Sequence, residues 1–446
     1  MKKYDNYKDS GIEWIGKIPS HWIMQRIDWV SKIVRGNTAF KKDELLDAGE
    51  YIALQYGKTY KVDVVDDSFN FYVNSEFFNE SQVTTKGDTI LISTSETVED
   101  LGHTCFYNNQ NVGLLGGEQI LLKPNRKFLH EKYLYHYSRQ FGSELRRYAR
   151  GLKVFRFNTS DLKQLFIAIP TLKEQISIAN FLDHKTSQID HLIAKKEQFI
   201  KLLEEERVAV INQAVTKGLD PNVPMKDSGV EWLGEIPEHW FLVPVKRVIE
   251  VRDGTHDTPE YVQNELISFP LITSKDFDGE EINFSNAKMI SESDHRAISK
   301  RSGVKSGDVL MSMIGGNIGK SLIIGNRDNF SIKNVALFMT RDNIFLAKYL
   351  RYYFDSGLLS KQIELKSRGG AQGFLSLGDI RNLIFFKFDS VELKIIIDYL
   401  DKTTTDISNV ISKTKQEIEL LKEYKTALIS EVVTGKVDVS TSSTQG

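Results

Sequence analysis

The chain has 446 residues, of which 41% are hydrophobic and 26% are charged, as is ordinary for globular proteins. Its formal net charge is −2, so nucleic-acid binding would have to come from local basic patches. The single cysteine, Cys105, excludes an internal disulfide and a zinc site built from thiolates. No run approaches the roughly 18 apolar residues of a membrane helix, and the first residues lack the apolar core of a signal peptide. We therefore expect a cytoplasmic protein.

One segment of the sequence occurs twice. The stretch KDSGIEWIGKIPSHW at residues 8–22 returns as KDSGVEWLGEIPEHW at residues 226–240, a spacing of 218 residues. Gly36 and Gly254 match at the same spacing, whereas the middles of the two halves drift out of register. Such a repeat predicts one structural frame that carries two divergent inserts. A duplication that only enlarged one core is the alternative.

Each half is expected to begin with a β-rich domain. Over residues 50–125, short runs of β-branched and aromatic residues alternate with turn residues, which predicts strands. Residues 132–148 carry apolar side chains at helical spacing, and a basic loop and a buried strand at residues 165–169 follow. Residues 266–388 repeat this order. We therefore expect two domains of similar architecture.

A long helix follows each domain in the sequence pattern. The first is expected from about Leu172 to Thr216, ended by Gly218, and the second over residues 391–433. Each has a narrow apolar seam that requires a partner, and the other copy would supply it in an antiparallel pair. Helices of ~40 residues span ~60 Å, enough to hold two domains well apart. Packing of each helix against its own domain is the alternative.

The expected fold class is therefore α+β, with two β-rich mixed domains, an antiparallel coiled-coil pair of long helices and an internal pseudo-two-fold repeat. The boundaries we expect are a first domain at 1–170, a central helix at 171–218, a second domain at 219–389, a C-terminal helix at 390–439 and a disordered tail at 440–446.

Two motifs suggest catalysis but fail in detail. The stretch IGGNIGKS has Ile314 where a phosphate-binding P-loop requires its first glycine. Asp355, Glu364 and Lys366 resemble a loose nuclease pattern, but they lie in a helical or loop context rather than at adjoining strand ends. We expect a non-catalytic chain without a metal site. A nucleotide- or metal-dependent nuclease that uses Lys320 or the acidic pair is the enzymatic alternative.

Polar and basic loops occupy equivalent places in the two halves. Arginine reads guanine edges, and asparagine or glutamine reads adenine. Threonine, serine, lysine and backbone amides hold phosphate groups. The candidate DNA-contacting residues are Arg35, Asn37, Thr38, Lys58, Arg150, Lys153, Arg156, Arg252, Thr255, His256, Thr273, Ser274, Lys275, Asn317, Arg368 and Gln372.

The order of domain, long helix, domain and long helix resembles the specificity (S) subunit of a type I restriction-modification system. The paired DSGxEWxGxIPxHW segments carry the resemblance most strongly. IPTLKEQISIANFLD at residues 169–183 is similar to the Pro-x-x-x-Glu-Gln opening of the central conserved helix of that family. RDGTHDTP at residues 252–259 and GDVLM at residues 307–311 resemble stretches of its target recognition domains. The resemblance covers nearly the whole chain.

The second long helix departs from the family pattern only at its entry. Phe388 and Leu393 stand where the first helix has Pro170 and Gln175, whereas Glu392 keeps the glutamate of the motif.

The resemblance implies that each target recognition domain reads one half of a split, asymmetric sequence in double-stranded DNA. It implies that the helix pair sets the unread gap and docks two methylation subunits, which carry S-adenosylmethionine and methylate adenine N6. Restriction subunits that use ATP and magnesium would join them. The chain itself would need no cofactor and no membrane. A two-domain scaffold that grips protein partners is the second alternative.

Overall fold

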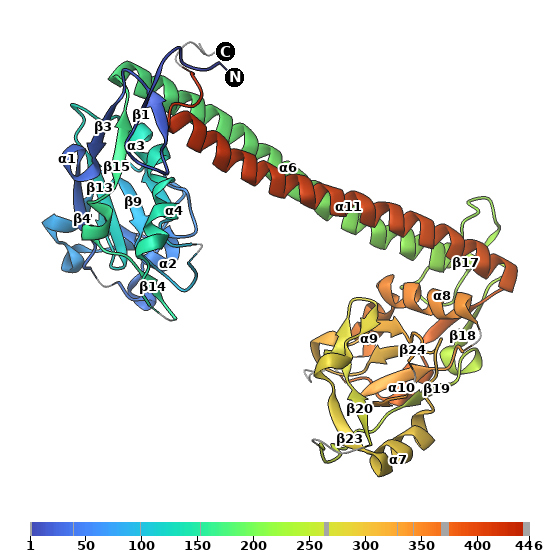
Figure 1. Ribbon diagram of the computed structural model, residues 1–446. Helices are drawn as coiled ribbons and strands as arrows, with labels where there is room; N and C mark the ends of the chain where they lie inside the picture. The colour runs from blue at the N-terminus through green and yellow to red at the C-terminus, as the bar shows by residue number, and fades with distance from the viewer. Residues whose placement is uncertain are drawn as a thin grey trace. The chain divides into compact units, whose positions relative to one another are not determined.

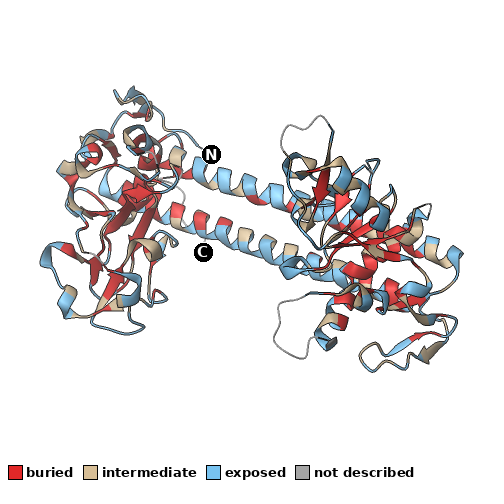
Figure 2. Cartoon of the chain, turned by 90° about the horizontal axis from the view of Figure 1, so that it is seen from below, coloured by how far each residue is buried: buried red, intermediate tan, exposed pale blue. Residues whose placement is uncertain are grey.

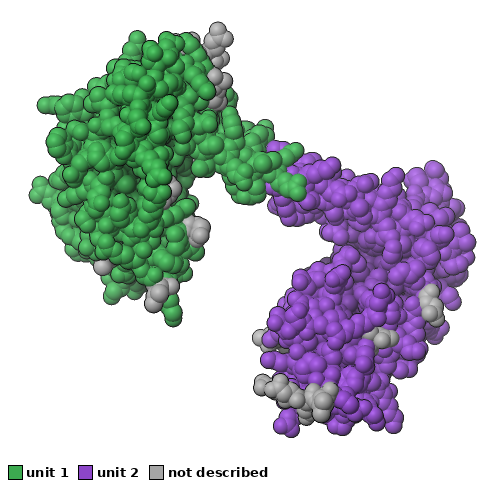
Figure 3. All heavy atoms as spheres, viewed as in Figure 1, with its two compact units in different colours: residues 1–195, 416–446 green, residues 196–415 purple. Residues whose placement is uncertain are grey.

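The computed structural model describes residues 2–38, 40–98, 100–151, 153–262, 267–327, 329–341, 343–366 and 374–439. The chain divides into two compact units (Figure 3). Unit 1 comprises Met1–Lys195 and Gln416–Gly446, and unit 2 comprises Lys196–Lys415. The domain boundaries expected from the sequence stay predictions, and the expected disordered tail at 440–446 lies outside the described residues.

Unit 1 is built on two sheets (Figure 1). Leu91, Ile120 and Leu122 on one face of the larger sheet join the core beneath α3 (Glu131–Ser138), and Ile90 and Leu121 on the other face join a second core. Successive strand residues point to opposite faces, so strands covered on both sides are continuously apolar. The larger sheet has the order β4 (Ser31–Arg35), β13 (Gln119–Pro124), β9 (Thr89–Ile92), β11 (Thr104–Tyr107) and β6 (Val64–Val65); the smaller has β7 (Tyr72–Val73), β5 (Tyr51–Leu54), β12 (Gly113–Leu115) and β8 (Val83–Thr84).

Unit 2 repeats the plan of unit 1, which confirms the internal repeat. Its helix α8 (Ile344–Asp355) corresponds to α3, and α7 (Glu292–Ser302) is a helix inside the segment expected to be β-rich. One sheet has the order β19 (Val251–Asp253), β27 (Val335–Phe338), β24 (Val309–Ser312) and β25 (Ser321–Ile323); the other has β23 (Lys288–Ser291), β20 (Ser268–Ile272) and β26 (Ser331–Ile332).

Short elements complete both units. In unit 1, β1 (Tyr7–Asp9) pairs with β2 (Lys17–Pro19) inside the repeated segment, and in unit 2, β16 (Met225–Asp227) pairs with β17 (Glu235–Pro237) in the same way. The remaining elements are β3 (Ile23–Arg26), α1 (Ile27–Val30), α2 (Tyr56–Thr59), β10 (Thr94–Ser95), α4 (Phe141–Leu145), β14 (Phe155–Arg156), α5 (Thr159–Leu162), β15 (Phe166–Ile169), β18 (Phe241–Pro244), β21 (Phe277–Asp278), β22 (Glu281–Ile282), α9 (Leu358–Lys366), α10 (Leu377–Arg381) and β28 (Ile384–Lys387).

The two long helices are α6 (Leu172–Lys217) and α11 (Ser390–Val433), close to the ranges predicted from the sequence. Gly218 follows α6 in the left-handed conformation, with φ of +72°, as a glycine at a helix C-terminus commonly does. In unit 1 the helices meet through Lys425 of α11, whose Nζ donates to Oδ1 and Oδ2 of Asp190 of α6 at 2.7 and 2.8 Å. The first part of α6 shares a core with the last part of α11 in unit 1, and the last part of α6 shares a core with the first part of α11 in unit 2, which confirms the antiparallel pair.

The repeated segment binds the start of the long helix that follows it. The indole Nε1 of Trp22 donates to Oε1 of Glu174 at 3.0 Å, and His21 Nε2 lies 3.0 Å from Oε2 of the same carboxylate. A carboxylate in the first turn also interacts favourably with the helix dipole. The second copy repeats both contacts at 3.0 and 2.8 Å, with Trp240, His239 and Glu392. The histidines of the repeat are therefore structural in this arrangement.

The departure at the second helix entry has a physical reason. In unit 1 the side chain of Gln175 is fully buried, and its Nε2 donates to the carbonyls of Phe128 and Pro170 at 3.0 Å each. In unit 2 the ring of Phe388 stacks on Trp240 with a centroid distance of 4.1 Å and an interplanar angle of 10°. Aromatic stacking thus replaces the amide hydrogen bonds at this junction.

The domain helix of each unit also binds its long helix through an aspartate. In unit 1, buried His136 of α3 lies with Nε2 2.8 Å from Oδ1 of Asp183, and Lys132 forms an ion pair with the same carboxylate. In unit 2, the hydroxyl of Tyr352 donates to Oδ1 of Asp401 at 2.8 Å. The same contact is therefore made with a titratable group in one unit and a phenol in the other.

Acidification is expected to loosen this contact in unit 1. Burial lowers the pKa of His136, so stability is lost as pH falls below the ordinary histidine value of about 6.5. Although burial alone would raise it, hydrogen bonds from His136 and Lys132 hold the pKa of Asp183 below its usual value. Its contribution is therefore lost below the ordinary aspartate value of about 3.9.

The variant His136→Tyr, which copies unit 2, should reduce the loss of unfolding free energy between pH 7 and pH 5. Urea unfolding of variant and wild type at both pH values measures the difference. An identical pH dependence in the two proteins would contradict this interpretation.

Candidate nucleic-acid interface

Three loops of unit 1 converge where β4 ends. A Cβ atom added to Gly36 would lie 1.9 Å from the carbonyl oxygen of Gly116, and one added to Gly116 would lie 2.4 Å from that of Leu54. The backbone of Gly117 donates to the carbonyl of Thr38 at 2.7 Å. Only glycine permits backbones to approach so closely. The loops after β4, after β5 and before β13 are therefore held together by main chain.

Unit 2 builds the same junction from different residues. A Cβ atom on Gly254 would lie 1.9 Å from the carbonyl oxygen of Ile332. The backbone of Asn334 donates to the carbonyl of Thr255 at 3.0 Å, and that of Lys333 donates to the carbonyl of Ile272 at 2.9 Å. The frame is thus shared, whereas the side chains that it presents differ between the units.

The substitution Gly36→Ala should destabilise unit 1 by about 1–3 kcal/mol, because the new methyl group meets backbone that cannot rotate away. Gly117→Ala is the matched control in the same junction. Its Cβ atom would meet only the oxygen of Thr38, at an ordinary 3.6 Å, so a change within about 0.5 kcal/mol is expected. Denaturant unfolding checks both values, and equal destabilisation by the two substitutions would contradict the close-approach argument.

Three candidate arginines of unit 1 share one open cleft of about 610 Å³. Arg35, Arg150 and Arg156 line it together with Ser93 and Thr94. Strands β10 and β14 pair here, which places the basic loop beside the end of β9. Cations and hydroxyl groups around one hollow are the donors that phosphate groups require.

The arginines of this cleft are only weakly neutralised. An NH2 group of Arg150 lies 3.7 Å from Asp161, and one of Arg156 lies 3.8 Å from Glu118. The two arginine side chains are 75% and 65% exposed. Although the Asp161 carboxylate is buried, both distances exceed hydrogen-bond range and both guanidinium groups are exposed, so each pair contributes about 1 kcal/mol or less. Their guanidinium groups can therefore change partners at little cost.

The other candidates of unit 1 lie outside this cleft. Asn37 is exposed, and its backbone amide donates to the side chain of Gln82 at 3.0 Å. The hydroxyl of Thr38 is buried without a hydrogen-bond partner among the described residues. The Nζ of Lys58 lies 4.2 Å from the centroid of the Phe71 ring. Lys153 is exposed in the basic loop. Their role in DNA contact stays a prediction.

His256 is held on both sides within unit 2. Its Nδ1 lies 3.0 Å from Oδ1 of Asn334, and its Nε2 lies 3.0 Å from Oδ2 of buried Asp253. Arg301 donates to the other oxygen of Asp253, at 2.9 and 2.6 Å. The imidazole is therefore oriented by the protein, and the hydroxyl of Thr255 beside it donates to the carbonyl of Asp257 at 3.3 Å.

The remaining candidates of unit 2 have mixed environments. Arg252 donates to Glu250 at 2.7 Å, and Thr273 caps a short turn by accepting from the amide of Lys275. The turn that contains Ser274 follows β20 as α2 follows β5, so the polar loops are equivalent in the two units. Asn317 is exposed in a short turn after β24. Arg368 and Gln372 lie outside the described residues.

Comparison with known proteins identifies this architecture. The family model for the type I restriction modification DNA specificity domain matches residues 19–202. The type I restriction enzyme MjaVIII specificity subunit of Methanocaldococcus jannaschii is 23% identical over 449 residues, covering 98% of this chain and 97% of the relative.

Residues 19–202 thus match the DNA specificity domain of type I restriction modification systems, and nearly the whole chain is similar to type I specificity subunits.

Solved structures share the fold of this chain. A chain of a type I R-M system, solved in work on its complex assembly and conformational transition, has a TM-score of 0.69 at 16% identity, covering 94% of this chain and 99% of that chain. The HsdS subunit from Thermoanaerobacter tengcongensis has a TM-score of 0.54 at 15% identity, covering 94% and 98%.

Two residues of the enzymatic alternatives, Lys320 and Glu364, have partners within unit 2. The Nζ of Lys320 donates to the carbonyl of Phe277 at 2.7 Å, so the lysine of the P-loop-like stretch bonds to its own domain. Burial raises the pKa of Asp355, and Glu364 forms an ion pair with Lys361 at 3.1 Å. In the part of the chain that the structure describes, no cluster of three or more metal-ligating side chains occurs.

Sequence reasoning missed the turn residues that complete the junction in the two units. Glu118 and Asn334 both have positive φ angles, of 65° and 55°, and they occupy equivalent turns before β13 and β27. Non-glycine residues rarely adopt this conformation, and asparagine does so more readily than most. The neighbouring pair Gly116-Gly117 was a signal for a turn in the first half, but the second half has no glycine there.

Proposed function

We propose that this specificity subunit directs a type I complex to a split, asymmetric DNA sequence, with one unit reading each half-site. The observation that supports this division is the repeated junction, which presents Arg35 and Asn37 in one unit and Thr255 and His256 in the other. Two different side-chain sets on one frame favour two different sequences. The chain is non-catalytic, because catalysis in these systems resides in other subunits.

The division into two readers also explains how a chain of low net charge can be specific. Each reader alone would bind weakly, because few cations line its cleft. Two weak readers in one chain gain effective concentration when the spacing of their half-sites is correct. Methylation subunits would add backbone contacts and would extrude the target adenine for reaction.

Type I specificity subunits act with methylation subunits, restriction subunits and DNA. We expect two methylation subunits, which carry S-adenosylmethionine, and restriction subunits that use ATP and magnesium, all in the cytoplasm. None of the described helices has the length and apolar character to cross a membrane. Much of both long helices is exposed (Figure 2). The exposed apolar side chains on them, which include Leu192, Phe199 and Val410, are expected docking points.

The proposal is tested by selection from a pool of random DNA duplexes. The chain in complex with its cognate methylation subunit should enrich a motif of two defined parts separated by a fixed number of undefined bases. The methylation subunit alone should enrich none. A contiguous motif, or equal enrichment without the chain, would exclude the split-target function. The scaffold alternative predicts a stable complex that selects no sequence.

Lengthening α6 and α11 together should change the gap and leave both half-sites unchanged. Four added residues extend a helix by ~6 Å, which corresponds to about two base pairs at ~3.4 Å each. Replacing four residues of each helix with alanine, without insertion, is the control and should preserve the gap. The selection experiment reads both quantities, and altered half-sites in the lengthened protein would contradict the modular account.

A further inference from the structure

Each unit has a second hollow of its own, between its domain and the parts of the long helices that belong to that unit. We name this hollow the helix cleft. In unit 1 it is lined by Asp63, Lys132, His136, Asp183, Asp190 and Lys425, among others. In unit 2 the lining includes Arg207, Glu280, Lys348, Arg351, Asp401 and Ser408. Residues 132, 183, 190 and 425 correspond to residues 348, 401, 408 and 207 in the internal repeat. The clefts can therefore be compared position by position.

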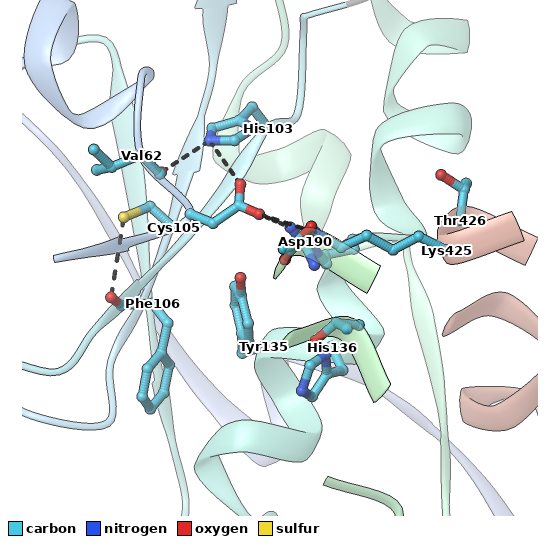
Figure 4. Close-up of polar contacts among 12 residues, drawn as sticks. Val62, His103, Cys105, Phe106, Tyr135, His136, Asp190, Lys425 and Thr426 are labelled. Carbon is cyan, nitrogen blue, oxygen red and sulfur yellow. Dashed lines mark hydrogen bonds and ion pairs between the residues drawn. The ribbon is translucent and has the colours of Figure 1, made fainter. Parts of the chain in front are cut away.

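In unit 1 the cation of the helix cleft, Lys425 of α11, is neutralised by a carboxylate of α6. Lys425 Nζ donates to both carboxylate oxygens of Asp190 at 2.7 and 2.8 Å, and it lies 3.7 Å from Asp63 (Figure 4). Arg139 forms a further ion pair with Asp63. The Lys425 side chain is only 15% exposed. Because an unpaired buried charge is destabilising, the carboxylate of Asp190 stabilises this lysine in its buried position.

Unit 2 keeps the cation and lacks its acid. Arg207 stands at the place of Lys425, and Ser408 stands at the place of Asp190. Arg207 makes no hydrogen bond or ion pair with the described residues, and its Nε is buried without a partner. A buried donor of this kind in a native protein calls for an explanation, such as a bound ion.

Among the described residues, the acids near Arg207 form no hydrogen bond or ion pair with it, although its charge acts to lower the pKa values of Glu280 and Asp355. The carboxylate of Glu280 forms an ion pair with Arg351, and this hydrogen bond is the main reason that the pKa of Glu280 is lowered. Asp401 pairs with Lys348. Burial raises the pKa of Asp355, although the charges of Arg351 and Arg207 act to lower it. No carboxylate of the described cleft therefore plays the part that Asp190 plays in unit 1.

We propose that the helix cleft of unit 2 is an oxyanion site, in which the guanidinium of Arg207 binds a phosphate or carboxylate group. The planar fork of arginine matches both groups, and Ser408, Thr405 and Asn409 supply further donors in the same lining. Arg327, whose guanidinium lies 4.1 Å from the ring centroid of Phe284, adds a second cation to this cleft. The volume of about 840 Å³ admits an anionic group attached to a larger body. This anion binding would be independent of DNA recognition and of any catalytic reaction.

The test uses the full-length chain and thermal unfolding at constant ionic strength. Inorganic phosphate replaces chloride in one arm, and acetate replaces it in the other, which separates a phosphate-bearing from a carboxylate-bearing ligand. A saturable rise in Tm is expected in at least one arm, and Arg207→Gln should weaken that response at least tenfold. Arg296→Gln, at an exposed arginine of α7 outside the helix cleft, is the matched control and should retain it.

The reciprocal exchange makes the test specific. Ser408→Asp, which installs the acid of unit 1, should abolish the anion response and raise Tm without added anion. Asp190→Ser should create a second anion response in unit 1. Abolition of the response by both Arg207→Gln and Ser408→Asp supports the site. A response that is absent from wild type, or that survives both substitutions, overturns it.

Discussion

Exchange of residues 24–165 for the corresponding segment of another specificity subunit should replace one half-site completely and leave the other half-site unchanged. The segment begins in β3 and ends just before β15, and these two strands pair antiparallel with Ile23 opposite Ile169. The two ends of the segment therefore lie close together, at the paired strands β3 and β15. A replacement segment would be joined to the rest of the chain at this one place. Adenine-methylation mapping of cells that carry the exchanged chain and its methylation subunit measures the outcome.

The matched experiment exchanges residues 242–383 in unit 2, where β18 pairs with β28 in the same manner. This exchange should alter the other half-site alone. A change in both half-sites after either exchange would show that the units do not read independently. Loss of all methylation would be resolved by measuring whether the exchanged chain still binds its methylation subunit.

Removal of the three cleft arginines, as Arg35→Ala, Arg150→Ala and Arg156→Ala together, should weaken DNA binding by about 10²–10³-fold at moderate salt. Each lost phosphate contact should also reduce the slope of log affinity against log salt by about 0.9. The guanidinium groups are exposed and weakly paired, so their removal should cost little stability. Equilibrium binding of the assembled methylation complex across a salt series measures both quantities.

Lys86→Ala, Lys127→Ala and Lys163→Ala form the control for the loss of three charges. These lysines are exposed in unit 1 and do not line the arginine cleft. If the control set weakened binding as strongly as the arginine set, the effect would be one of net charge, and the cleft would lose its assigned role.

The sequence predicted the repeat and the long helices because both depend on periodic signals. Apolar positions spaced by three and four residues specify a helix over many turns, and Gly218 ends α6 where expected. The apolar runs of β9 and β13 also predicted strands. The reason that these runs are continuously apolar is that each face of the two strands packs against a core, which only the structure shows.

Other features could not be predicted because they depend on contacts between distant residues. Helix α7 is short and polar, and its signals are confined to its ends: Ser291 at the N-cap, acidic residues in the first turn, basic residues in the last turn and Gly303 at the C-cap. The bond between Trp22 and Glu174 joins residues 152 positions apart, so the repeated segment alone did not reveal its partner. The convergence of Arg35 with the basic loop likewise follows from the packing of strands that are distant in sequence.

The central claim is that this chain supplies the DNA address of a type I complex as two separate half-sites. Mapping of N6-methyladenine by long-read sequencing tests it most directly, in cells that express the cognate methylation subunit with and without the chain. The account predicts a split motif that appears only when the chain is present. A soluble methylation subunit that yields no motif with the chain, or the same motif without it, would contradict the account.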